Sequence, residues 1–262
     1  MSRYVSSRFA AAVIAAVIAA MVAAVAACGS SPASPAAASS PATSAAKGRA
    51  ATAAPAPGSP APGTGGAIVA AAVANTQKAS TVRMTGAGSQ AGKGVTFDLT
   101  LVRGQGCEGT LSMSKADTFQ LVYLGQTVWM KPSDAFYASL GNNKAALSLL
   151  QGKYIKLKAT NSLIGNITTL CTMSGLLGGV SPPSGAGYAA SAATFNGRPA
   201  VKITQAAHPG YAIVSDTAEP LLLQVSVPGS AGGTITFSDY NAPAKITPPP
   251  PAQTIEGSQL GL

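Results

Sequence analysis

The sequence predicts an α+β fold built on an antiparallel β-sheet, as one domain over residues 67–251 of 262. Short runs of alternating apolar and polar residues are separated by turns roughly every 8–12 residues, which is typical of consecutive antiparallel strands. Two stretches have helical spacing instead: an alanine-rich run at the start of this domain and a central segment, residues 133–177. We therefore expect a helix, a group of strands, a helical insertion and a second group of strands.

The first helix is expected over residues 67–79, which contain no Gly or Pro. The period then changes to two, and Phe97, Leu99 and Leu101 alternate with threonine and aspartate. This alternation places the three apolar side chains on one face of a strand. The strands expected in this group cover 81–85, 96–101, 108–113, 119–124 and 127–130, with a glycine-rich turn at 86–94.

The central segment begins with a capping signal. Ser133 or Asp134 is expected to cap a short helix over 135–140. A second short helix is expected over 144–151, ended by Gly152. A strand at 153–158 and a strongly apolar helical stretch at 162–177 complete the segment.

Strands return after a loop of Gly, Pro and Ser at 178–187. Asn196-Gly197 is a hairpin signal between two of them. The strands expected here cover 188–195, 199–205, 211–215, 220–227 and 234–240, with a turn at 208–210. Four prolines at 248–251 close the domain, and residues 252–262 are expected to form a loose tail.

The N-terminus is typical of an export signal. Arg3 and Arg8 precede an apolar run at 10–24, small residues and Cys28. Residues 25–28, Val-Ala-Ala-Cys, resemble the bacterial lipobox. We therefore expect residues 1–27 to be removed and Cys28 to be diacylated. A diacylated Cys28 would hold the protein on the extracytoplasmic face of the cell membrane. An ordinary signal with a chance cysteine, or an uncleaved membrane anchor, are the alternatives.

Residues 28–66 carry the predicted lipidated cysteine and a stretch rich in Ala, Pro, Ser and Gly. This stretch has too little apolar surface to offset the entropy of ordering, so we expect a disordered tether. As a flexible coil it would average roughly 35 Å from end to end. Its expected role is to space the domain from the membrane.

Charge and cysteine usage limit the partners. The net charge is +9, but the basic residues are scattered without interleaved aromatics, which argues against nucleic acid. The charge suits anionic headgroups or wall polymers.

With Cys28 lipidated, Cys107 and Cys171 form an even pair, and a disulfide is expected in an oxidising compartment. Two buried free thiols are the alternative. Two distant cysteines and one histidine offer no metal-ligand spacing.

No catalytic motif stands out. Residues 104–109 match G-x-G-x-x-G, but a strand follows rather than a helix, so we interpret them as a turn. His208 precedes Pro-Gly, and the acidic residues occur singly. We therefore expect no enzyme and no cofactor. A hydrolase is retained as an alternative that needs His208 or two acids to converge in a cleft. Trp129 is interpreted as a core or cavity residue.

Four stretches carry a family resemblance: Gly-Thr-Leu-Ser at 109–112, Thr-Val-Trp-Met-Lys-Pro-Ser at 127–133, Gly-Lys-Tyr-Ile-Lys-Leu at 152–157 and Gly-Thr-Ile-Thr-Phe-Ser-Asp-Tyr-Asn at 233–241. With them the chain resembles the LppX/LprG group of actinobacterial lipoproteins, which share the LolA-like carrier fold. The resemblance implies a strongly curved antiparallel sheet, a half-barrel, with helices covering its concave face. It also implies a lipid or acylated glycolipid held in the cavity between them, with residues 133–177 as a lid.

The leading hypothesis is a membrane-anchored protein that binds or carries a lipid or other amphiphile in an apolar cavity, without catalysis. Plain core packing is the alternative for each residue of the expected cavity. These residues are Phe97, Leu99, Leu101, Val122, Val128, Met130, Phe136, Leu147, Leu150, Leu163, Ile164 and Ile167. The competing hypothesis is a structural or interaction lipoprotein with a filled core that binds a partner protein or a cell-wall polymer. An export transporter is a further candidate partner.

Overall fold

The structure is a computed structural model. It describes residues 65–90, 93–114, 117–139, 150–161, 164, 170–177, 187–206, 208–229, 232–260 and 262. The predicted signal segment, Cys28 and the tether up to residue 64 lie outside these residues, and so do Leu147, Leu163 and Ile167.

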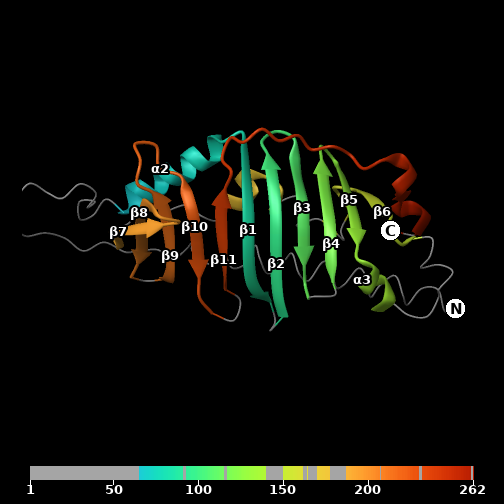
Figure 1. The fold of residues 1–262 in the computed structure, drawn as a ribbon, viewed down its shortest axis with the longest axis horizontal. Helices are drawn as coiled ribbons and strands as arrows, with labels where there is room; N and C mark the ends of the chain where they lie inside the picture. The colour runs from blue at the N-terminus through green and yellow to red at the C-terminus, as the bar shows by residue number, and fades with distance from the viewer. Residues whose placement is uncertain are drawn as a thin grey trace, which may run out of the picture.

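The described chain forms one twelve-stranded sheet (Figure 1), in the order β12-β6-β5-β4-β3-β2-β1-β11-β10-β9-β8-β7. The strands are β1 Thr81–Gln90, β2 Lys93–Val102, β3 Gly106–Ser112, β4 Thr118–Leu124, β5 Thr127–Pro132, β6 Tyr154–Lys158, β7 Tyr188–Phe195, β8 Arg198–Gln205, β9 His208–Ser215, β10 Leu222–Val227, β11 Gly233–Ser238 and β12 Thr254–Glu256. All neighbours pair antiparallel except β12, which is parallel to β6. The predicted fold class is therefore confirmed in part: the described chain is mainly one mixed sheet with few helices, and the sheet is open, with β12 and β7 at its ends.

Two runs of hairpins build this sheet. β1 to β6 pair in chain order, and so do β7 to β11. The two runs join where β1 pairs with β11, with Arg83 opposite Ser238 and Met84 opposite Phe237. Short connections join neighbouring strands except β5 and β6, between which residues 133–153 intervene. The alternating pattern therefore accounts for the order of the hairpin-connected strands, but not for the pairing of β6 with β5.

Alternation along the strands gives the sheet one apolar face, which we call the inner face. Its buried side chains form a continuous set from β6 to β8, the inner-face cluster. The sheet residues in it are Val82, Met84, Phe97, Leu99, Leu101, Cys107, Leu111, Phe119, Leu121, Val128, Met130, Leu157, Val201, Ile203, Val214, Leu222 and Phe237. The opposite, outer face carries mainly threonine, serine and charged residues.

Three α-helices accompany the sheet in the described residues: α2 Gly65–Lys78, α3 Asp134–Ser139 and α6 Met173–Leu177. Helix α2 lies against the β7–β10 end of the sheet and contacts α6 (Figure 1). Its buried residues Val69, Ala72 and Val73 join the inner-face cluster. Helix α3 follows β5, and the Ser133 hydroxyl accepts the Phe136 amide at 3.2 Å, the contact of an N-cap. Ser133 is therefore the capping residue.

The predicted turn at 86–94 is mostly strand. β1 continues through Gly86 to Gln90, and β2 begins at Lys93. Glycines weaken the strand signal in a sequence, but Gly86 has a structural role. It lies opposite Phe97, whose ring occupies the space that a Cβ at position 86 would need. The turn expected at 208–210 is likewise the start of β9.

The predicted loose tail at 252–262 is wrong. Residues Pro251–Gln253 form η1, a 3₁₀ turn, β12 pairs with β6, and Gly257–Leu260 form a second 3₁₀ turn, η2. The free edge of β6 supplies the backbone partners, which no local sequence pattern in the tail could indicate. Before this, residues 239–250 cross one end of the strands (Figure 1), and Ile246 is buried on the outer face.

Candidate ligand-binding face

The inner face brings together most of the predicted cavity residues. Seven belong to one cluster, and each is at most 8% exposed: Phe97, Leu99, Leu101, Val128, Met130, Phe136 and Ile164. Leu150 is partly buried and packs against this cluster. Leu147, Leu163 and Ile167 lie outside the described residues. The sheet and two parts of the central segment thus share one apolar layer.

Val122 does not point into this layer. It packs on the outer face with Val102 and Ile246, in a smaller cluster that also contacts Trp129. Strand β4 reads Phe-Gln-Leu-Val-Tyr-Leu from residue 119, so its second half is apolar on both faces. Alternation alone therefore could not assign the face, whereas Phe119 and Leu121 fix it in the structure.

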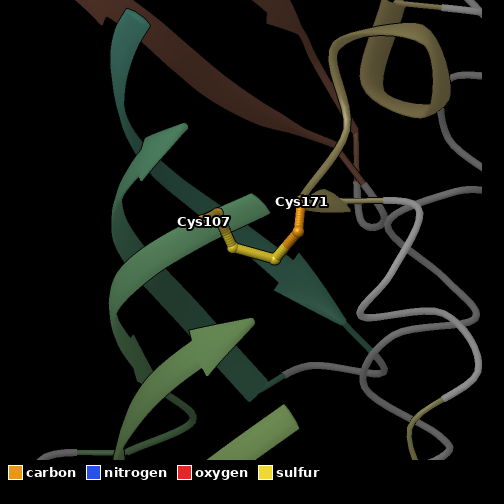
Figure 2. The surroundings of a disulfide bond; sticks show 2 residues. All are labelled: Cys107 and Cys171. Atoms are coloured by element: carbon orange, nitrogen blue, oxygen red, sulfur yellow. A yellow bond between two sulfur atoms is a disulfide. The ribbon is translucent and has the colours of Figure 1, made fainter. Parts of the chain in front are cut away.

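A disulfide between Cys107 and Cys171 joins the central segment to the sheet (Figure 2). Their Cα atoms are 5.0 Å apart, and both residues are buried within the inner-face cluster. Leu170, Met173 and Leu177, next to this bond, are buried in the same cluster. The predicted disulfide is thus present, and it holds residues 170–177 on the inner face.

One polar network is buried at the α2 end of this face. The Thr76 hydroxyl accepts the Leu222 amide at 3.1 Å and lies 3.4 Å from the Tyr240 hydroxyl. Tyr240 in turn donates to the Leu222 carbonyl. Burial raises the pKa of Tyr240, while the hydrogen bond with Thr76 acts in the opposite direction. Each buried polar group here has a partner, so the network fastens α2 and the β11 end to β10.

The hydroxyl of Tyr137, on α3, differs. It is buried and has no hydrogen-bond partner, whereas every other buried side-chain nitrogen and oxygen of the described residues has one. Burial raises the pKa of Tyr137 to about 12, and the nearby charge of Asp134 adds to the shift. An unpaired buried hydroxyl costs roughly 1–3 kcal/mol. Sequence reasoning missed this residue, because a tyrosine beside Phe136 gives no signal that its hydroxyl is enclosed.

The outer face carries the charged groups. Arg83 donates to both carboxylate oxygens of Asp98, at 2.8 and 2.6 Å, and its other nitrogen lies 3.7 Å from Asp239. The hydrogen bond from Arg83 lowers the pKa of Asp98. A general acid needs a raised pKa, so this carboxylate does not suit the acid role in a glycosidase pair. Exposed pairs of this kind also contribute little to stability.

The turn between β2 and β3 covers residues 103–105, so the predicted turn at 104–109 is confirmed only at its start, and residues 106–109 belong to β3. Gly104 adopts φ +77°, and β3 starts at Gly106 without a helix. In the described residues, no three His, Cys, Asp or Glu side chains form a group that could hold a metal ion. Within those same residues, no helix is long and apolar enough to cross a membrane.

No protein-family model matches the chain, and no curated protein sequence matches it. Among solved structures, LprF from Mycobacterium bovis matches with a TM-score of 0.48 and 13% identity, over 71% of this chain and 96% of that one. The Mycobacterium tuberculosis lipoprotein LppX matches with a TM-score of 0.43 and 14% identity, over 70% of this chain and 98% of that one. Both are mycobacterial lipoproteins of the LppX/LprG group, the group that the sequence resembles.

Proposed function

We propose that this chain is an extracytoplasmic lipoprotein, anchored through Cys28, that binds a lipid or similar amphiphile on the inner face of its sheet without catalysis. In this proposal the inner face is the concave face of a half-barrel, and the central segment 133–177 covers it. The amphiphile's acyl chains lie between the two.

The observation that carries the proposal is the extent of the apolar inner face. Twelve strands at normal spacing make a sheet roughly 50 Å wide. Helix α2 has 14 residues, which corresponds to a length of about 21 Å. Since α3 and α6 have only 6 and 5 residues, the described helices are small against this area. The sheet side chains of the inner-face cluster are at most 8% exposed, and residues of the central segment such as Leu170, Met173 and Leu177 are buried with them. In this proposal the acyl chains enter this apolar layer, between the central segment and the sheet.

The predicted anchor supports the same reading. Cys28 follows an apolar run, and a long tether separates it from α2. Two acyl chains on one cysteine hold a protein firmly at a bilayer, and the tether gives the domain reach above it. A lipid-binding face in this position has direct access to membrane lipids.

Mass spectrometry of the non-covalent organic extract tests ligand binding. Full-length protein is purified from an actinobacterial host, alongside the variant Leu150→Trp/Ile164→Trp, which fills the inner face. Thr110→Trp, on the exposed side of β3, is the matched control. We expect a stoichiometric lipid with wild type and control, and less with the double variant, each variant being checked for folding by circular dichroism. A wild-type extract without lipid would refute the proposal.

The anchor has its own test. Cys28→Ala is compared with wild type by membrane fractionation and by labelling with palmitate. We expect label and membrane association in wild type only. If the alanine variant still sedimented with membranes and carried label, Cys28 would not be the anchor.

A second function is favoured by one observation: the seven described cavity residues in the inner-face cluster are almost fully buried. A filled core of this kind fits an interaction lipoprotein that uses its sheet surface to bind a partner protein or wall polymer. A lipid-free wild type, together with a specific crosslinked partner at the cell surface, would establish this alternative.

A further inference from the structure

The strongest unexplained feature of the molecule is the hydroxyl group of Tyr137. The residue is 2% exposed, and its oxygen has no hydrogen-bond partner. Its ring packs against Phe136, with ring centroids 6.0 Å apart, inside the inner-face cluster. The Tyr137 amide is paired, since it donates to the Ser133 carbonyl at 3.2 Å. The side-chain hydroxyl has no partner.

The other buried side-chain nitrogens and oxygens of the described residues are paired. The hydroxyl of Tyr240, a partly buried residue, donates to the Leu222 carbonyl and contacts the Thr76 hydroxyl. A phenylalanine at position 137 would keep the packing and avoid the unpaired group, because the two side chains differ only by this hydroxyl. An isolated donor in an apolar layer is therefore best explained by an acceptor that arrives from outside the protein.

We propose that the Tyr137 hydroxyl is the polar anchor of the inner-face site, donating a hydrogen bond to an ester carbonyl of an acylated lipid. This inference rests on the proposed function and adds the chemistry of the ligand to it. A neutral acceptor fits better than a carboxylate or phosphate, because the negative charge of Asp134 acts on Tyr137 and the surroundings are apolar.

The position of Tyr137 also orients the ligand. Helix α3 follows directly after β5 and lies at one end of the sheet (Figure 1). The ring of Phe136 packs on Phe119 of β4, with centroids 4.8 Å apart, so α3 adjoins the apolar surface that continues through Leu121 and Leu99. The ester lies at α3, and the acyl chains extend from it over β4, β3 and β2. Because the hydroxyl is enclosed, α3 must move for the ligand to enter.

The test compares an ester with an ether. Full-length wild type, Tyr137→Phe and the control Tyr154→Phe are each titrated with dipalmitoylglycerol and with its ether analogue, dihexadecylglycerol, in detergent, and binding is measured by native mass spectrometry. Tyr154 lies on the outer face, where its hydroxyl bonds Gln120 at 2.8 Å, so the control removes a hydroxyl remote from the site.

We expect Tyr137→Phe to bind the ester about tenfold more weakly than wild type, which corresponds to one lost hydrogen bond. Its affinity for the ether should equal that of wild type, and its melting temperature should be equal or higher. Equal ester binding by Tyr137→Phe and wild type would overturn the inference while leaving the proposed function intact. An equal loss for ester and ether would overturn it too, by indicating a packing role. Failure of wild type to bind either lipid would instead remove the proposed function on which it rests.

Discussion

Gly86 lets an aromatic ring cross the β1 backbone. Phe97, directly opposite on β2, places its ring where a Cβ of residue 86 would be, and this ring is buried in the inner-face cluster. Phe97, which the sequence predicts as a cavity residue, therefore packs over Gly86. A buried ring with no room to move makes this pair sensitive to a single added methyl group.

Gly86→Ala is expected to lower the free energy of unfolding by about 1–3 kcal/mol, because the added methyl displaces Phe97. Urea denaturation measures the change. Gly94→Ala is the matched control, since a Cβ there meets no atom within 4 Å. In the background Phe97→Leu, the alanine should cost less. Equal costs at positions 86 and 94 would contradict the packing argument.

The free energy of unfolding is expected to fall at alkaline pH, because the folded protein raises the pKa of two tyrosines. Burial raises the pKa of Tyr137 to about 12 and also raises that of Tyr240. In the unfolded chain both ionise near pH 10. Above that pH the unfolded state binds fewer protons than the folded state, so the free energy of unfolding falls as pH rises, by up to about 1.4 kcal/mol per pH unit for each tyrosine. Urea denaturation between about pH 9 and pH 12 should show a shallower decline for Tyr240→Phe than for wild type, and parallel curves would refute this.

Single residues also mark how far the sequence could be interpreted. Leu99 and Leu101 alternate with polar neighbours, so their inward direction was predictable. Val122 lies in a run that is apolar on both faces, and only the pairing of β4 with its neighbours decides its direction. Tyr137 was not predictable, because the enclosure of a hydroxyl depends on tertiary packing.

At the scale of elements, α2 is fixed to the sheet by one threonine. Thr76 is fully buried, and its hydroxyl accepts the amide of Leu222 at the start of β10. Asn75 adds a hydrogen bond to the Pro220 carbonyl at 3.2 Å. The alanine-rich helix has few large side chains, so these polar contacts add to the apolar packing of Val69 and Val73 in fixing its position.

Thr76→Val keeps the shape of the side chain but leaves the Leu222 amide without an acceptor. We expect a loss of about 1–3 kcal/mol in the free energy of unfolding, the usual cost of an unpaired buried donor. Thr76→Ser retains the hydroxyl and should lose less. Hydrogen exchange at the Leu222 amide measures this contact directly. We expect faster exchange in Thr76→Val but not in Thr76→Ser. Exchange at the wild-type rate in Thr76→Val would argue against the contact.

Elements with strong local signals were predicted well, and those that depend on distant partners were not. The α2 helix, the capped α3 and most strands follow from period and capping residues. β12 has three residues and forms only because β6 offers an edge. The extension of β1 through a glycine-rich stretch likewise depends on β2 and β11 as neighbours on both sides.

At the scale of the whole molecule, the disulfide links segments 64 residues apart. In the chain-entropy model, closing a loop of this length stabilises the folded state by about 4 kcal/mol. Cys107→Ala/Cys171→Ala should therefore unfold at a markedly lower urea concentration than wild type. Wild type unfolded in the presence of reductant serves as the comparison, because it loses the bond but keeps both thiol side chains. A double variant as stable as oxidised wild type would contradict the expectation.

Only part of the proposed function could be predicted from the sequence. The expected export signal, lipobox and tether are linear patterns, so they predict the location of the protein at the cell membrane without knowledge of its fold. The apolar inner face follows from alternation. The ligand chemistry does not, because it depends on which polar groups meet between the sheet and the insertion.

The pairing of β1 with β11 has a consequence for how the protein is made. During synthesis, β1 to β6 emerge first and can pair with one another, while the other edge of β1 stays open until β11 arrives, far later in the chain. An unpaired edge beside apolar strands readily recruits another chain. We therefore expect the nascent protein to be most prone to aggregation between the synthesis of β6 and that of β11, so its yield depends on how quickly the last third of the chain is made.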